Sequence, residues 1–349
     1  MSVGILSTGS YVPKEEVSNA EVAARVGVTP EWIERKTQIR TRRYAAASQA
    51  ASDLAVKAAH RALLGAALDA GDLDYIIVST STGDAPSPPT ANLVQDALGA
   101  GNAACFDLNV VCSGFVYGLA LARSLLRLHP GRRALVVAAD VYSRILDFTD
   151  RRTAVLFADG AGAAILGEVP AGYGVLDVDL RSRGDAHHLI GVPAGGSRLP
   201  ASHATVAAGQ HYFRMDGRGV SEFVLANVPA VIEAFVRRAG LDLDEIDHFI
   251  PHQGNGNLMT ELVEASGLGK ARTHRTIDRF ANMGSASVAV TLDHAVHDLN
   301  DGDTVLLVGF GGGISVGSCL LRWADPWRLR RRDDAARSGA QDSIRGAWR

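Results

Sequence analysis

Cys112 is the residue of this chain whose surroundings best fit a nucleophile. The apolar run 108–111 precedes it and Ser113-Gly114 follows it, which predicts a strand that enters a sharp turn into a helix. A thiol at such a turn is exposed to the helix dipole and to unpaired backbone N–H groups, and both favour the reactive thiolate. Cys105 and Cys319 lie inside apolar strands, where buried and inert cysteines are expected.

His252 is the candidate for donating a hydrogen bond or moving a proton. It directly follows the buried-strand residues Phe249-Ile250. Reactive groups of α/β proteins gather at the carboxyl ends of strands, and an imidazole can serve there as acid, base or donor. A hydrogen-bonded core histidine is the alternative interpretation. Other histidines show no metal-ligand spacing and are expected on the surface or in loops: His187, His188, His203, His211, His274, His294 and His297.

Asn282 and a run of glycines complete the candidate site. Asn282 begins a predicted helix, where a capping role alone could explain it. Its equivalence to Cys112 in the repeat described next favours a catalytic role. The segment Gly309–Gly313 follows a strand and precedes another, and it lacks the spacing of a dinucleotide-binding loop. We therefore expect it to contribute to an oxyanion hole.

An internal repeat predicts the elements that position these residues. In each half a helix, an acidic stretch and a short buried strand precede the candidate residue, which opens a second helix followed by two apolar strands. In the first half these are 50–70, 72–74, 75–78, 112–128, 134–137 and 161–166, and in the second half 220–239, 242–247, 248–250, 282–299, 305–308 and 315–321. The pattern predicts a layered α/β fold with two halves related by a pseudo-twofold axis, and a site between them.

The domain prediction is one half over residues 1–170, carrying Cys112, and one over 171–322, carrying His252 and Asn282. Residues 181–219 show little periodicity and are expected to form an insertion or a substrate-covering loop. The tail 323–349 is predicted to be basic and disordered. Its last 24 residues carry seven Arg and three Asp, a net charge of +4, which leaves −7 for the rest of the chain.

Composition excludes several classes of protein. With 349 residues, 47% hydrophobic and 21% charged, the chain is neither disordered, collagen-like nor a coiled coil. A net charge of −3 does not favour electrostatic binding to nucleic acid or to an anionic membrane. The absence of a long apolar run and of a signal peptide predicts a cytoplasmic protein. Three cysteines are too few and too scattered for a disulfide framework or a zinc site.

Several motifs together resemble the β-ketoacyl-ACP synthase III family of the thiolase superfamily. The resemblance runs in order from the N-terminus to about Arg322. Its blocks are 9–13 (GSYVP), 31–33 (EWI), 111–118 (VCSGFVYG), 150–151 (DR), 157–163 (FADGAGA), 251–253 (PHQ) and 309–313 (GFGGG).

The resemblance implies a five-layered αβαβα thiolase-like fold, a homodimer, and no metal or bound cofactor. It implies that Cys112, His252 and Asn282 are catalytic, and that the backbone N–H groups of Cys112 and Gly312 form the oxyanion hole. Cys112 then accepts an acyl group from a thioester of acyl-carrier protein or CoA. His252 and Asn282 stabilise the enolate formed when a malonyl-type thioester loses CO2, and this carbanion attacks the acyl-cysteine to give a β-ketoacyl product.

Departures from the family pattern bear on the substrate. The resemblance assigns Trp32, Lys36, Arg151 and Asn255 to the pantetheine and CoA entrance, and Ser87 to the mouth of the acyl pocket. Ser87 stands where the family commonly has Phe, whose ring reaches the site of the partner subunit. The smaller side chain predicts a wider or differently shaped pocket and disfavours an acetyl primer.

Other departures bear on the thioester carrier. Lys36 replaces a frequent Arg, and Asn257 replaces an expected basic residue, which predicts weaker phosphate binding and a carrier-protein donor. Arg42, Arg43 and Arg152, with Arg151 and the tail, are expected to attract that acidic carrier. We expect a specialised paralogue in polyketide or other secondary metabolism.

Two other functions remain open. A related acyltransferase would pass the acyl group from Cys112 to a hydroxyl, an amine or another nucleophile without decarboxylation. A catalytically silent subunit would only bind carrier protein. Asn282 favours condensation because it is a neutral donor rather than a base, and Cys112 disfavours a silent subunit.

Overall fold

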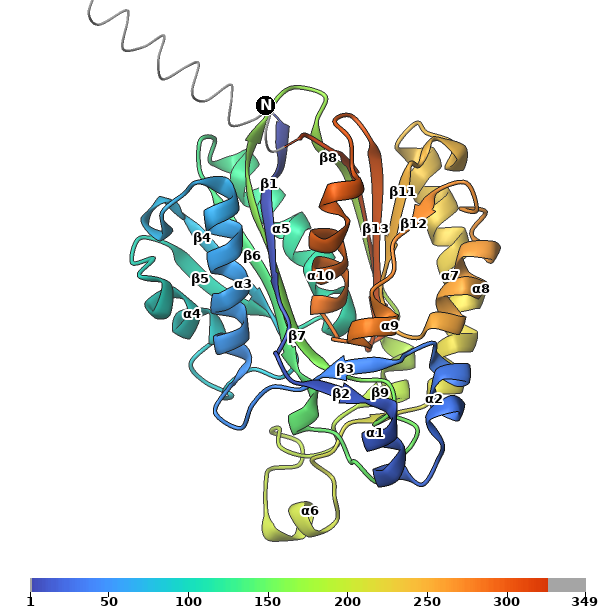
Figure 1. Cartoon of the computed structure of the whole chain (residues 1–349). Coiled ribbons are helices and arrows are strands. Elements are labelled where there is room, and N and C mark those ends of the chain that lie inside the picture. Colours follow the sequence, from blue (N-terminus) through green and yellow to red (C-terminus); the bar gives the residue numbers. More distant parts are fainter. Residues whose placement is uncertain (1, 326–349) are drawn as a thin grey trace, which may run out of the picture.

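The computed structural model describes residues 2–325 as two mixed five-stranded sheets with helices between and outside them (Figure 1). In the first sheet β4 pairs in parallel with β5 and β6, while β7 pairs antiparallel with β6 and β1. In spatial order its strands are β1 (Ser2–Tyr11), β7 (Asp159–Val169), β6 (Ala134–Val141), β4 (Tyr75–Ser79) and β5 (Ala104–Leu108).

The second sheet repeats this arrangement. Here β11 pairs in parallel with β12 and β13, while β14 pairs antiparallel with β13 and β8. Its strands in spatial order are β12 (Arg272–Thr273), β11 (His248–Pro251), β13 (Thr304–Gly311), β14 (Ser315–Arg322) and β8 (Gly174–Ser182). The chain passes from the first sheet to the second between β7 and β8. The β-α-β repeat predicted from the sequence is confirmed.

Five layers result because two helices lie between the sheets and others cover the outer faces (Figure 1). The central helices are α5 (Gly114–Leu128) and α10 (Ala286–Ala295). Most of α10 is buried on all sides, as expected of a helix that is apolar all round. The outer helices are α3 (Ala51–Ala66) and α4 (Thr90–Leu98) on the first sheet, and α7 (Gly217–Arg238) and α8 (Gly256–Ala265) on the second. The predicted αβαβα architecture is therefore confirmed.

Two segments of the chain lie outside the five layers and form the entrance to the site. The first holds the hairpin β2 (Glu16–Ser18) and β3 (Thr41–Arg43) with α1 (Asn19–Val26) and α2 (Pro30–Thr37). The Thr29 side chain accepts a hydrogen bond from Trp32 N–H and so caps α2. The second segment is the predicted covering loop, which contains β9 (Ile190–Gly191), α6 (His203–Ala207) and β10 (Arg214–Met215).

The remaining elements are short. They are α9 (Ile277–Phe280) and 3-10 turns over 70–72, 111–113, 142–144, 184–189, 243–245 and 296–298.

Two helical segments among residues 2–325 have the length and hydropathy of a membrane span, 111–128 and 217–238. The first contains α5, whose side chains form the core between the two sheets. The second is α7, which packs Val224, Val228, Ile232, Phe235 and Val236 onto the second sheet. Packing within the fold explains the apolar character of both segments.

The structure corrects three of the sequence predictions. The tail does not start at residue 323, because Trp323 is buried and its backbone is hydrogen-bonded to Gly302 and Asp303; residues 326–349 lie outside the described part of the chain. Cys319 is fully buried as predicted, but Cys105 is partly exposed because β5 is an edge strand. His274 is buried rather than on the surface, with its Nε2 atom 2.9 Å from His248 Nδ1.

Candidate active site

Cys112 lies in the 3-10 turn that joins β5 to α5. The preceding residue, Val111, has a φ of +46°, a left-handed conformation that a β-branched residue rarely adopts. The end of β13 presses against the cysteine from the other half. A Cβ atom at Gly311 would lie 2.6 Å from the Cβ of Cys112 and 3.0 Å from its Sγ. Only glycine fits there without a shift, and the thiol is held between the two halves.

Two features of the surroundings of Cys112 oppose ionisation of its thiol. Burial raises its pKa, and the negative charge of Asp140 raises it further. Both effects oppose the stabilisation that the sequence analysis expects from the helix N-terminus, and that expectation stays a prediction. The cysteine precedes the first residue of α5 by two positions, and only 6% of it is exposed.

His252 follows β11 and remains neutral. Its backbone N–H donates to Val308 O (2.7 Å). Its imidazole ring meets the Phe310 ring edge-on, with the ring centroids 5.3 Å apart. Burial lowers the pKa of His252 to about 3. The ring atom Nδ1 is buried without a hydrogen-bond partner among residues 2–325. Because a buried N–H without an acceptor is rare in proteins, the tautomer with its proton on Nε2 is favoured.

Asn282 lies in the loop between α9 and α10. It does not cap the helix: α10 begins at Ala286, and Ser285 occupies the capping position. The Asn282 Oδ1 atom accepts a hydrogen bond from Gly284 N–H (2.9 Å). Its backbone is tied to the first half, since its N–H donates to Leu156 O and its carbonyl accepts from Ala158 N–H. With Oδ1 engaged, Nδ2 is the amide end available to a ligand.

Cys112, His252 and Asn282 line one inner pocket of about 210 Å³ at the junction of the halves. Apolar side chains, including Phe157, Phe213 and Phe310, form much of the remaining wall, and Gly311 also lines it. Gly312 is buried beside the pocket. A Cβ atom there would lie 3.3 Å from Val111 and Ile190 side-chain carbons. The role of the Gly312 backbone N–H in the oxyanion hole stays a prediction.

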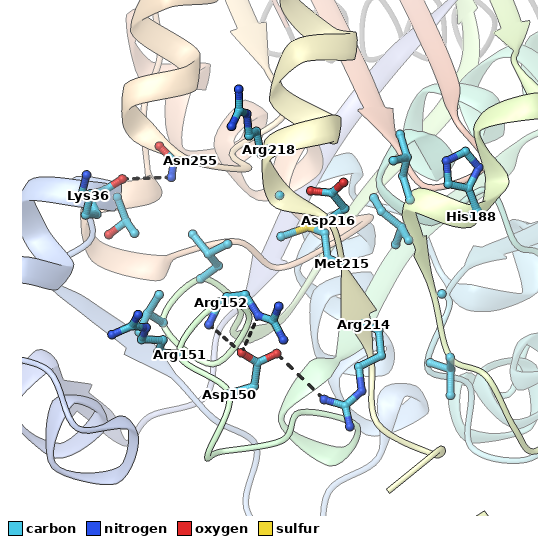
Figure 2. A pocket seen from close by; sticks show the side chains of 18 of the residues that line it. Lys36, Asp150, Arg151, Arg152, His188, Arg214, Met215, Asp216, Arg218 and Asn255 are labelled. Carbon is cyan, nitrogen blue, oxygen red and sulfur yellow. Dashed lines mark hydrogen bonds and ion pairs between the residues drawn. The ribbon is translucent and has the colours of Figure 1, made fainter.

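A larger cavity of about 930 Å³ adjoins the inner pocket, and Figure 2 shows side chains that line it. The predicted entrance residues Trp32, Lys36, Arg151 and Asn255 all line it. The Arg151 guanidinium lies 5.9 Å from the centroid of the Trp32 ring, and Asn255 Nδ2 donates to Lys36 O (3.1 Å). Both cavities share several wall residues: Arg152, Leu156, Ile190, Met215, Gly217 and Asn255.

The covering loop supplies entrance residues that the sequence analysis did not single out. His187, His188, Arg214 and Arg218 line the larger cavity. The two histidines are exposed loop residues as predicted, but they also form part of this wall. Arg214 lies 3.5 Å from Asp147 and 3.9 Å from Asp150, and Arg218 pairs with Glu222. The predicted covering loop was the only signal that pointed to these residues.

Two further predicted residues lie outside both cavities of this chain. Ser87 is in the exposed loop 83–89, and its predicted part in an acyl pocket stays a prediction. Arg42 is fully buried, and its guanidinium donates to Val155 O and Asn19 Oδ1, so it offers no charge to a partner. Arg43 pairs with Glu16. The predicted cationic surface is smaller than the sequence suggests.

Asn257 has a structural part in place of a charge. Its amide nitrogen donates to the carbonyls of Arg35 and Lys36, both at 3.0 Å, and its Oδ1 accepts from Gln38 Nε2 (2.8 Å). These bonds fasten α8 to the C-terminal end of α2. At this position the chain therefore has an amide that ties two entrance helices together, in place of the basic residue expected from the resemblance.

Comparisons with known proteins agree with this geometry. The family model for 3-oxoacyl-[acyl-carrier-protein] synthase III matches residues 106–184, and the model for its C-terminal part matches 236–323. The chain is 47% identical to acetoacetyl CoA synthase NphT7 of Streptomyces sp. strain CL190, over 91% of this chain and 98% of that protein. It is 41% identical to β-ketoacyl-[acyl-carrier-protein] synthase III of Caldanaerobacter subterraneus subsp. tengcongensis, over 93% and 98%.

Solved structures show the same likeness. One is 3-oxoacyl-(acyl carrier protein) synthase III, FabH, of Pseudomonas aeruginosa PAO1, with a TM-score of 0.85 and 34% identity over 93% of this chain and 99% of that one. Another is the priming β-ketosynthase of the R1128 polyketide pathway, with a TM-score of 0.87 and 32% identity over 93% and 97%.

Proposed function

The chain belongs to the 3-oxoacyl-[acyl-carrier-protein] synthase III family, and we propose that Cys112, His252 and Asn282 carry out the two steps of its reaction. The enzyme is an acyltransferase of the condensing type: an acyl group moves to a cysteine and is then joined to a malonyl thioester with loss of CO2. Transfer to another nucleophile without decarboxylation is less supported, because the relatives are condensing enzymes. The joint placement of the three residues in one pocket carries the assignment.

In the first step Cys112 Sγ attacks the thioester carbonyl. The C–S bond of the thioester breaks, the acyl group stays on Cys112, and the thiol proton ends on the departing pantetheine thiol. The tetrahedral oxyanion needs preorganised donors, and the backbone N–H groups of Cys112 and Gly312 are assigned to it. Dividing the reaction at an acyl-enzyme replaces one difficult step by two easier ones.

In the second step a malonyl thioester enters the same pocket. His252 Nε2–H and Asn282 Nδ2–H donate to its thioester oxygen, so that negative charge can develop there as the C–C bond to the carboxylate breaks. The resulting carbanion attacks the acyl carbonyl on Cys112, and the cysteine sulfur leaves and regains a proton. Neutral donors suit this step because the pocket is buried and a fixed charge would be costly there.

We assign CoA rather than a carrier protein as the preferred carrier of the thioesters. Lys36 and Arg151 flank Trp32 and form no ion pair within residues 2–325, so they are available to phosphates. The only charged side chains of the adjacent helix α8 are Glu261 and Glu264, which disfavour an acidic protein partner. The name of the relative NphT7, an acetoacetyl CoA synthase, supports the same choice.

A short acyl group such as acetyl fits the inner pocket best. Tyr142, Phe157 and Phe213 form an aromatic cluster, with ring centroids 4.6 to 5.4 Å apart, and Phe157 and Phe213 face the pocket. The three side chains are almost fully buried, and their rings close part of the pocket wall, which favours a short acyl group. Ser87 lies outside the pocket of its own chain, so the effect expected from this residue would be exerted on the pocket of a second copy.

A cytoplasmic homodimer is our proposal for the assembly. The edge strand β5 has no neighbour on its outer side among residues 2–325, and Phe106 and Leu108 on it are only partly buried. Such an edge suits pairing with a second copy. The exposed Ser87 loop could then reach the partner, as the family resemblance implies.

Intact-protein mass spectrometry tests the first step, and product analysis tests the second. The full-length enzyme should gain one acetyl group from acetyl-CoA and, with malonyl-CoA, release acetoacetyl-CoA. The kcat/KM for malonyl-CoA should exceed that for malonyl-carrier protein. Lys36→Ala and Arg151→Ala should raise the KM for CoA thioesters, whereas Arg40→Ala, an exposed control outside both cavities, should not. A higher kcat/KM with an acyl group bound to carrier protein than with the matching CoA thioester would restore the expectation drawn from the sequence.

A further inference from the structure

Asp140 is a fully buried acid that neither reaction step uses. It lies near the carboxyl end of β6, and none of its surface is exposed. Its carboxylate accepts hydrogen bonds from Ser81 N–H (2.8 Å), Ser81 Oγ (3.0 Å) and Thr82 Oγ1 (2.9 Å), with Thr80 Oγ1 at 3.3 Å. It also accepts from Ser285 N–H (2.8 Å) and Ser285 Oγ (2.7 Å).

The two carboxylate oxygens face different halves of the molecule. Oδ1 receives the donors of the segment after β4, and Oδ2 receives both donors of Ser285 at the start of α10. Burial raises the pKa of Asp140, and the donated hydrogen bonds act in the opposite direction. An acid so fully supplied with donors, two of them backbone N–H groups, is suited to holding a loop in place.

The loop that it holds carries Asn282. Gly284 is wedged against Asp140 and Tyr142: a Cβ atom there would lie 2.5 Å from Asp140 Oδ2 and 2.3 Å from Tyr142 Cε2. Gly284 has a φ of +57°, and its N–H donates to Asn282 Oδ1 (2.9 Å). The place of Gly284 therefore decides which end of the Asn282 amide is free for the substrate.

We propose that Asp140 is a positioning residue for the decarboxylation step, which it serves by holding Ser285 and Gly284 so that Asn282 presents Nδ2 to the malonyl thioester. The proposal rests on the function proposed above for Asn282. It makes the carboxylate a link between the half that carries the nucleophile and the half that carries the donors. Acyl transfer to Cys112 does not use Asn282 and should depend less on this link.

Asp140→Asn is the informative change because it preserves size. An amide has one accepting oxygen, so either Ser285 or the segment after β4 loses its acceptor. Two serine variants form a matched pair. Ser285→Ala and Ser81→Ala each remove one hydroxyl that bonds to Asp140, but only Ser285 adjoins the Asn282 loop.

The experiment uses full-length enzyme and measures two rates, acetylation of Cys112 by acetyl-CoA and decarboxylation of malonyl-CoA, with unfolding curves as a check on folding. We expect Asp140→Asn to slow decarboxylation about tenfold or more beyond its effect on acetylation. Ser285→Ala should show the same selectivity to a smaller extent, and Ser81→Ala should show none. The double variant Asp140→Asn with Asn282→Ala should decarboxylate malonyl-CoA no more slowly than Asn282→Ala alone.

Several results overturn the proposal. One is an equal loss of both rates in Asp140→Asn and Ser285→Ala, and another is losses that multiply in the double variant. If Asp140→Asn does not fold, equal behaviour of Ser285→Ala and Ser81→Ala is sufficient to reject it. A normal decarboxylation rate in Asn282→Ala rejects the function proposed for Asn282 and this proposal with it. If Asn282→Ala decarboxylates malonyl-CoA slowly but Asp140→Asn does so at the normal rate, only the Asp140 proposal is rejected.

Discussion

Gly311 and Cys112 touch across the junction of the two halves, with no room for even one methyl group between them. Gly311→Ala should therefore displace the thiol and slow acetylation by about 100-fold, because small misplacements of a reacting group are that costly. The rate of mass gain with acetyl-CoA measures this. Gly269→Ala is the control, since a Cβ atom there meets nothing within 4 Å. Normal acetylation of Gly311→Ala would contradict the contact.

Cys112→Ala should abolish acyl-enzyme formation while the protein stays folded. The thiol is the only acyl acceptor proposed, and the substitution removes one buried atom. Intact-protein mass spectrometry after incubation with acetyl-CoA gives the readout. Cys105→Ala is the matched control because Cys105 is partly exposed on β5 and lines neither cavity. Stable acylation of Cys112→Ala at a single site would falsify the assignment of the nucleophile.

His252→Ala and Asn282→Ala should each slow malonyl-CoA decarboxylation by about 100-fold or more, since each removes a donor to the developing oxyanion. Acetylation of Cys112 should be largely retained. The two rates are measured separately, by CO2 release and by mass gain. An equal loss of both rates would mean that these side chains support the fold or the thiol instead. If neither variant affects turnover, acyl transfer to another nucleophile without decarboxylation is favoured over condensation.

Alkylation of Cys112 should depend on pH in a way that reports Asp140. Burial and the Asp140 charge both raise the pKa of the thiol, so the rate of reaction with iodoacetamide should be low at neutral pH and rise into the alkaline range. Asp140→Asn removes a negative charge next to the thiolate, so its profile should move to lower pH. An unmoved profile would show that burial alone sets the pKa. Mass spectrometry of the alkylated peptide identifies the site.

The sequence revealed the repeat because both halves spell the same order of helix, acidic turn, strand and helix. Buried strands such as 134–137 and 305–308 are unbroken apolar runs. The candidate catalytic residues come at the ends of such runs or at the start of the helices that follow. Cys112, His252 and Asn282 could be found for this reason, although they are far apart in the chain. Their convergence on one pocket follows from the arrangement of the two halves.

Other features depend on tertiary contacts that no local pattern reports. Arg42 looks like a surface cation, but its alternating position on β3 points it inward to Asn19 and Val155. The pKa of Cys112 depends on Asp140, which is 28 positions away and sits in an apolar strand. The lining residue Arg214 comes from a segment without sequence periodicity, and Arg218 lies in the first turn of α7 directly after it.

Val111 has a consequence for how this enzyme could be evolved. A β-branched residue at a φ of +46° costs stability, of the order of 1–3 kcal/mol. Val111→Gly would relieve this strain, but it would also raise the entropy of the unfolded chain and release the turn that aims the neighbouring thiol. A library built to obtain a more robust catalyst should keep position 111 constant and seek its gains on the outer faces of α3 and α7.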